Sequence, residues 1–195
     1  MPQLPTPYPH RLSGQTLTGS CHCTQLHYTI TIPSHPPADF PTIDFDHCTS
    51  CRLTSGGLVM CWLIIRLEWL TFTSHPGVGV LDMVSSGGNS NEETKAPMRG
   101  YKSSPDVTRG FCGNCGASLT FYRDGREWVD VSVAGLGKEV VQWLGGPDVQ
   151  SWVGDSVGWV HGMAREGFGT DGERGWRVRE FERGGEDSEI VCKDH

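Results

Sequence analysis

The amino-acid sequence predicts a single domain of mainly β structure, and three observations support that fold class. Only 36% of the 195 residues are hydrophobic, while 26 are glycine and 12 are proline. This mixture favours short strands and many turns over long helices. One stretch near the N-terminus alternates apolar and polar residues in the manner of a strand. Further along, an Asp-Gly pair separates two strand-like stretches, which is a strong hairpin signal.

The first predicted elements lie in the N-terminal half of the chain. Residues 1–13 are proline-rich and polar, so we expect a loose lead-in. Leu26–Ile32 (LHYTITI) predicts a strand. Ser34–Pro41 is expected to be a loop, because its three prolines have no amide hydrogen to donate to a sheet. We expect a buried strand at Leu58–Ile65 and a neighbouring strand at Leu67–Phe72, although short apolar runs are also compatible with a turn of helix.

The second half of the chain predicts a loop, a hairpin and a tail. Ser85–Lys95 is rich in glycine, serine and asparagine, which is typical of a solvated loop. Ser118–Arg123 and Trp128–Gly135 predict the two strands of a hairpin that turns at Asp124-Gly125. Residues 167–195 are rich in glycine and charge and are expected to add little to the core. The domain itself is therefore assigned to residues 14–166.

Charge and apolar patterning exclude several classes of function. The formal net charge is −7 and the pI about 5.5, which argues against nucleic acid or an anionic membrane as the main partner. The longest apolar stretch, Leu58–Leu70, is interrupted by Arg66 and Glu68 and is too short to span a bilayer. The N-terminus has no apolar run of the kind found in signal peptides. We therefore expect a soluble, cytoplasmic protein, in which eight cysteines indicate metal ligands or reactive thiols rather than disulfides.

Six of the eight cysteines fall into three close pairs. They are Cys21 with Cys23, Cys48 with Cys51, and Cys112 with Cys115. The last pair, in FCGNCG, has the glycine pattern of a zinc knuckle, whereas a lone CxxC is also compatible with a chance pair or a redox couple. A closed zinc site needs four ligands, so one pair must join another, and spacing alone leaves open which pairs join. Of the remaining two cysteines, Cys61 is expected to be a packed core thiol, and Cys192 has no partner in the sequence.

Three blocks of the sequence together resemble the glutathione-dependent formaldehyde-activating enzyme family, which also includes zinc domains like that of centromere protein V. The blocks are GSCHC, HCTSC and YKSSPDVTRGFCGNCGASLTFY. The likeness runs from about Gly14 to about Trp159 and includes WVGDSVGW. It implies a β-tent fold, in which antiparallel sheets surround a structural zinc.

The resemblance implies two zinc sites. In the first, Cys21, Cys23, Cys112 and Cys115 would form a closed four-sulfur structural site. In the second, the family has CxCxxC, which provides three thiolates and an open position for the sulfur of the substrate. Here Cys48 and Cys51 match the second and third cysteines, and Asp46 stands where the first is expected.

Three interpretations of Asp46 are compatible with the sequence. Its carboxylate oxygen is a legitimate zinc ligand, and a harder donor than sulfur should make the metal a stronger Lewis acid. Alternatively, the neighbouring His47 is the third ligand, since sites with two sulfurs and one nitrogen also occur among catalytic zincs. In the third interpretation Asp46 only caps a turn, and the second site is a degenerate remnant.

Three further positions bear on the family comparison. Arg52 corresponds to a position that is often basic in the family, where it would meet a carboxylate of the substrate; a solvated turn residue explains it equally well. Thr24 stands where the family has a glycine after CxC, and Gln150 lies near a position where a histidine is frequent.

The resemblance implies a zinc enzyme of the carbon–sulfur lyase type, which adds a thiol such as glutathione to formaldehyde. A second hypothesis keeps the zinc but replaces the substrate by another small carbonyl compound, which would undergo hydration, hydrolysis, elimination or isomerisation without glutathione. A third hypothesis is a non-catalytic, zinc-stabilised interaction module. The sequence leaves open the natural substrate, the direction of reaction, the oligomeric state and the order of the C-terminal tail.

Overall fold

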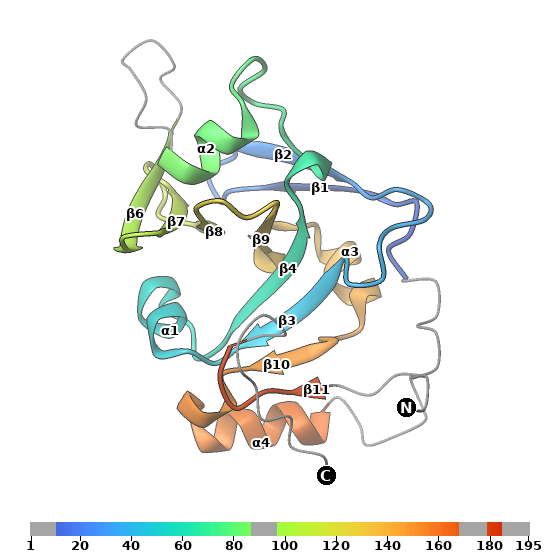
Figure 1. The fold of residues 1–195 in the computed structure, drawn as a ribbon, viewed down its shortest axis with the longest axis vertical. Helices are drawn as coiled ribbons and strands as arrows, with labels where there is room; N and C mark the ends of the chain where they lie inside the picture. Colours follow the sequence, from blue (N-terminus) through green and yellow to red (C-terminus); the bar gives the residue numbers. More distant parts are fainter. Residues whose placement is uncertain (1–10, 87–96, 168–178, 185–195) are drawn as a thin grey trace.

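The computed structural model describes residues 11–86, 97–167 and 179–184. These residues form two β-sheets with short helices around them (Figure 1), which confirms the mainly β fold class. The strands are β1 Thr16–Ser20, β2 His27–Thr31, β3 Thr42–Asp46, β4 Met60–Arg66, β5 Leu70–Phe72, β6 Met98–Ser104, β7 Val107–Cys112, β8 Ser118–Arg123, β9 Trp128–Ser132, β10 Val149–Ser151 and β11 Arg179–Glu180. The α-helices are α1 Thr49–Ser55, α2 Val80–Ser86, α3 Lys138–Leu144 and α4 Gly158–Gly167, and short 3-10 helices occupy Leu67–Trp69, Val133–Gly135 and Val153–Asp155.

The larger sheet has the strand order β11-β10-β3-β4-β9-β8-β7-β6, and the smaller one has the order β1-β2-β5. Nearly all neighbours are antiparallel, as expected, but β10 runs parallel to both β3 and β11. Asp44 supports the parallel pairing with β3, because its carboxylate accepts hydrogen bonds from both the backbone N–H and the hydroxyl group of Ser151. Helix α2 packs on β6, β7 and β8, while α4 lies next to β11 (Figure 1), where His161 pairs with Glu180.

The main hydrophobic core joins the two sheets. Its most deeply buried residues come from β2, β4, β8 and β9, and they include Ile30, Leu63, Ile65, Leu119 and Val129. Those from β4, β8 and β9 belong to one face of the large sheet, because side chains alternate between the faces along a strand, and Ile30 meets them from the small sheet. The opposite face is therefore free to carry a polar site.

Several predicted elements are confirmed. The strand expected at Leu26–Ile32 is β2, and the buried run Leu58–Ile65 contains β4. Strands β8 and β9 form the predicted antiparallel hairpin, with Gly125 in the left-handed region at φ 83°. Residues 34–41 belong to no strand or helix, as the prolines indicate.

The strand expected at Leu67–Phe72 is confirmed only for Leu70–Phe72, and the expectation that it neighbours the preceding strand is wrong. Residues Leu67–Trp69 form a 3-10 turn, which buries Trp69 and redirects the chain to the other sheet. The short strand that follows, β5, pairs with β2 through Leu70 opposite Ile30 and Phe72 opposite Tyr28. A 3-10 turn of three residues leaves no periodic pattern, so the apolar run concealed the change of sheet.

Residues assigned to the two ends contribute to the packing. Leu12, in the expected lead-in, is fully buried, and Arg11 beside it forms an ion pair of 2.7 Å with Asp148. In the expected tail, β11 extends the large sheet and Phe181 is buried. Most of the expected loop 85–95 lies outside the described residues, and so do residues 168–178 and 185–195 of the tail. Among the described residues, no helix is long and apolar enough to cross a membrane.

Candidate functional site

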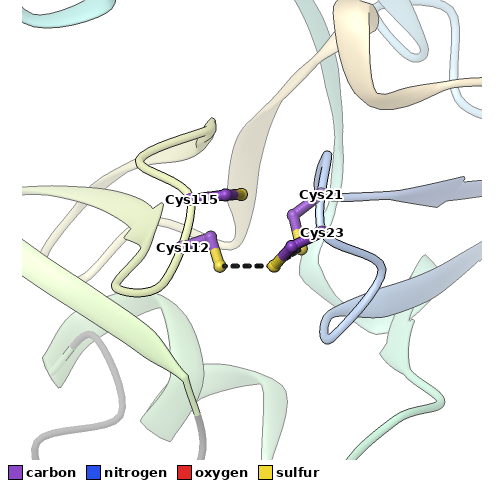
Figure 2. Close-up of side chains that lie close together, drawn as sticks. All are labelled: Cys21, Cys23, Cys112 and Cys115. Atoms are coloured by element: carbon purple, nitrogen blue, oxygen red, sulfur yellow. Dashed lines mark hydrogen bonds between the residues drawn. The ribbon is translucent and has the colours of Figure 1, made fainter.

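Four cysteines from two distant turns come together between the sheets. Cys21 and Cys23 lie in the turn between β1 and β2, Cys112 ends β7, and Cys115 lies in the turn before β8 (Figure 2). The four sulfurs lie within 4.8 Å of one another. The Sγ atoms of Cys21 and Cys23 are 3.5 Å apart, and those of Cys23 and Cys112 are 3.7 Å apart. Zinc–sulfur bonds of about 2.3 Å in a tetrahedron give sulfur separations of about 3.8 Å, so the donor set fits a closed tetrahedral metal site.

Backbone turns hold these sulfurs in place. The N–H of Leu26 donates to Cys21 Sγ at 3.3 Å, and Gly116, in the left-handed region at φ 75°, donates its N–H to the carbonyl of Cys112. Thr24 also adopts a left-handed conformation, with φ 61°. This is the position where the family has glycine, and the backbone explains why glycine suits it.

The metal-free thiols differ in acidity. Hydrogen bonds from the Asn114 side chain and the Gln25 backbone lower the pKa of Cys23 to about 6, whereas burial raises the pKa of Cys112 to about 12. Metal binding requires all four sulfurs as thiolates, so it must be accompanied by proton release.

The second cluster is formed by Asp46, Cys48 and Cys51, which also provide ligand atoms within 4.8 Å of one another. Asp46 ends β3, Cys48 is the N-cap of α1, and Cys51 lies in the first turn of that helix. One carboxylate oxygen of Asp46 accepts the N–H of Cys48 at 2.8 Å, and the other accepts the thiol of Cys51 at 2.8 Å. Asp46 therefore caps the turn and also points a carboxylate oxygen at the thiols, and its role as a metal ligand stays a prediction.

Arg109 completes this cluster, and sequence reasoning missed it. It lies on β7, and its Nη1 donates to Cys51 Sγ at 3.2 Å, although 58 residues separate the two in the chain. Its Nε donates to Ser103 Oγ at 3.1 Å, and its guanidinium lies 5.0 Å from the centre of the Phe121 ring. The only signal in the sequence was its place in the RGFC block.

Apolar side chains border the second cluster. Cys51 packs in a small buried group with Met60 and Trp62, against which Cys48 and Phe121 also pack. The surroundings raise the pKa of Cys51, because its thiol bonds with Cys48 and is buried beside Asp46, whereas the hydrogen bond with Cys51 lowers the pKa of Cys48. The two thiols are thus unequal before any metal binds.

His47 belongs to a different set of hydrogen bonds. Its ring is buried, its Nε2 lies 2.9 Å from Gln150 Oε1, and the amide nitrogen of Gln150 donates to Glu180. Glu180 also pairs with His161 Nε2 at 3.0 Å. Burial lowers the pKa of His47. Within the described ranges, His47 is not among the residues whose ligand atoms gather with the thiols of Cys48 and Cys51.

Of three other positions singled out in the sequence, two lie within the described residues. Arg52, in α1, is half-buried, and its Nε atom is buried without a hydrogen-bond partner in the described structure. Its role as a partner for a substrate carboxylate stays a prediction. Cys61 packs against the core, as expected, and burial raises its pKa to about 12. Cys192 lies outside the described residues.

One of the comparisons with known proteins covers the residues of both clusters. A family sequence model described as "Glutathione-dependent formaldehyde-activating enzyme" matches residues 16–155, well over half of the chain. A search of curated proteins gave no match. Among solved structures, the chain is similar to a Rhodobacter sphaeroides protein determined by structural genomics, with 18% identity, a TM-score of 0.43, and coverage of 63% of this chain and 89% of that one.

Proposed function

The chain belongs to the glutathione-dependent formaldehyde-activating enzyme family, and we propose that it is a zinc-dependent enzyme of the carbon–sulfur lyase type. Its reaction would add a thiol to a small aldehyde or release the thiol from the adduct, with glutathione as the candidate co-substrate. The observation that carries the proposal is the convergence of Asp46, Cys48 and Cys51 in a cluster of their own, separate from the four-sulfur cluster.

The donor atoms support two different metal roles. Four thiols form a closed set, which is typical of structural zinc, whereas two thiols and one carboxylate leave one position open, as in catalytic zinc sites. Zinc bound to Asp46, Cys48 and Cys51 would keep the sulfur of the substrate deprotonated. In the addition, the thiolate sulfur forms a bond with the aldehyde carbon, the carbonyl π bond breaks, and the oxygen takes up a proton.

The residues around the cluster would favour this chemistry. Trp62 and Phe121 provide an apolar border that limits access of water, which strengthens electrostatic interactions within the site. Asp46 is held by the N–H of Cys48, so its second oxygen has a fixed direction. A cytoplasmic location agrees with the proposal, because clustered thiols stay reduced in that compartment.

A second candidate function keeps the metal but not the glutathione. The observation that favours it is the carboxylate of Asp46, whose second oxygen lies 2.8 Å from Cys51 Sγ. An oxygen ligand makes the metal a harder Lewis acid than three sulfurs would, which suits activation of a small carbonyl compound.

Metal content per chain, measured by mass spectrometry on protein purified without chelators, tests the proposal. We expect two zinc ions in the unaltered protein and one in Asp46→Ala, with two retained in the control Asp124→Ala, which removes an exposed carboxylate. Formation of the thiol–formaldehyde adduct is then followed by NMR with and without glutathione. Turnover of a small carbonyl compound without thiol would favour the second candidate. One zinc ion in every variant would contradict both candidate enzymatic functions and would favour a non-catalytic interaction module.

A further inference from the structure

We propose that Arg109 is a positioning residue of the second metal centre, where it neutralises the charge of the centre and withdraws electron density from the sulfur of Cys51. This inference rests on the proposed function, because it assigns a role relative to the metal held by Asp46, Cys48 and Cys51. It concerns a residue on β7, which lies outside the ligand set.

The guanidinium of Arg109 is fixed from three sides. Its Nη1 donates to Cys51 Sγ at 3.2 Å, its Nε donates to Ser103 Oγ at 3.1 Å, and Phe121 lies against its face at 5.0 Å. Arg109 is only 8% exposed. A long side chain held in this way has already lost its rotamer freedom, so its hydrogen bond to sulfur needs little further ordering.

The charge of the centre requires a partner of this kind. With both cysteines deprotonated, Asp46, Cys48 and Cys51 carry three negative charges, and a divalent ion leaves one of them uncompensated. Cys51 is 1% exposed, and an uncompensated charge at such a site is costly. The single positive charge of Arg109 brings the total to zero. An arginine guanidinium does not lose its proton in proteins, so this charge is always present.

The same hydrogen bond influences the metal. A charged N–H donor draws electron density from a thiolate, which then gives less of it to the metal. Asp46 acts in the same direction, because oxygen is a harder donor than sulfur. Arg109 and Asp46, which both contact Cys51 Sγ, would therefore both increase the Lewis acidity of the centre. Lysine would supply the charge but not the planar fork that binds Cys51 and Ser103 at once.

The test compares Arg109→Met and Arg109→Lys with the control Arg123→Met. Arg123 is an exposed cation on β8, paired with Asp106, so its loss changes the net charge equally. Affinity of the second metal is measured by competition with a zinc indicator, and the cobalt(II)-loaded proteins are examined by absorption spectroscopy. Loss of a residue that supports a metal ligand typically lowers metal affinity about 10–100-fold. We expect this loss of metal affinity in Arg109→Met and a smaller loss in Arg109→Lys. The metal affinity of Arg123→Met should equal that of the parent protein.

The cobalt spectrum separates this role from a structural one. Without the hydrogen bond to Cys51, the sulfur-to-metal charge-transfer band should move to lower energy in Arg109→Met, while the four-sulfur site stays loaded and reports on folding. If Arg109→Met does not fold, the shift of the same charge-transfer band in Arg109→Lys tests the inference. If the parent protein binds two metals, unaltered metal affinity and an unaltered cobalt spectrum in both Arg109 variants would overturn this inference and leave the proposed function standing. A parent protein with one metal would overturn it together with the proposed function.

Discussion

Asp46 makes the contacts of a turn cap and, in the proposed metal site, also supplies a ligand atom. Its two carboxylate oxygens are used separately, one for the N–H of Cys48 and one for the thiol of Cys51. A cysteine at this position would supply a sulfur for the metal but only a weak acceptor for the turn. The substitution therefore retains three donors at the cluster and adds a hydrogen bond to the backbone.

The variant Asp46→Cys tests this interpretation, because it restores the CxCxxC pattern of the family. We expect it to keep the second metal and to show a more intense sulfur-to-cobalt charge-transfer band, since three thiolates would replace two. Loss of the turn hydrogen bond should lower the free energy of unfolding by about 1 kcal/mol. Cobalt absorption and chemical denaturation measure the two effects. An unaltered band intensity would contradict a metal-facing position 46.

Thr24 shows the opposite case, in which a residue fits its backbone poorly. Its φ of 61° lies in the left-handed region, where a β-branched side chain is strained. Thr24→Gly should therefore raise the free energy of unfolding by about 0.5–1 kcal/mol, the difference between the relieved strain and the greater entropy of unfolded glycine. Thr24→Ala is the matched control, because it removes the branch but keeps the Cβ atom. Chemical denaturation of the zinc-loaded proteins measures the difference, and equal stability of the two variants would refute the explanation.

At the scale of elements, β7 connects the two candidate sites. Side chains alternate along a strand, so Arg109 and Cys112 leave β7 on opposite faces. Arg109 reaches Cys51 on one side, while Cys112 joins Cys23 on the other. Both sites thus depend on the register of the same strand with β6 and β8.

The four-sulfur site links the β1–β2 turn of the small sheet to β7 of the large one. Apparent binding energies of structural zinc are about 10–16 kcal/mol, comparable with the whole stability of a domain. We therefore predict that Cys112→Ser loses its cooperative thermal transition or fails to fold. Cys48→Ser, which removes a ligand of the second site only, should melt within a few degrees of the parent protein. A Cys112→Ser variant with an unaltered melting temperature would exclude the structural role.

The sequence predicted those parts of the site that depend on local spacing. Cys112 and Cys115 share one turn, so their pairing could be inferred without knowledge of the fold. The contact of Arg109 with Cys51 could not be inferred from the sequence, because it depends on which strands become neighbours in the sheet. Helix α1 was also missed, since seven residues are too few for an apolar period. The strands β1 and β3 were missed because they are short and half polar, and their pairing partners decide their conformation.

At the scale of the whole molecule, the two clusters differ in what surrounds them. Cys21 and Cys112 belong to the main hydrophobic core, so their metal would add a strong link between the β1–β2 turn and β7. Cys48 and Cys51 belong to the small separate group around Trp62, at the base of a helix of seven residues. Loss of metal should therefore have global consequences at the first site and local ones at the second.

Stepwise removal of metal tests this difference. During titration with a chelator, we expect the first equivalent of zinc to leave without change in far-UV circular dichroism, because an open site with three protein ligands releases its ion more readily than a closed one. The second equivalent should leave together with the β-sheet signal, since the four sulfurs then take up protons and no longer link the β1–β2 turn to β7. Released zinc and circular dichroism are recorded on the same sample. Cys48→Ser serves as the control and should show only the second step, whereas unfolding that accompanies the first equivalent would mean that the second site also holds the fold together.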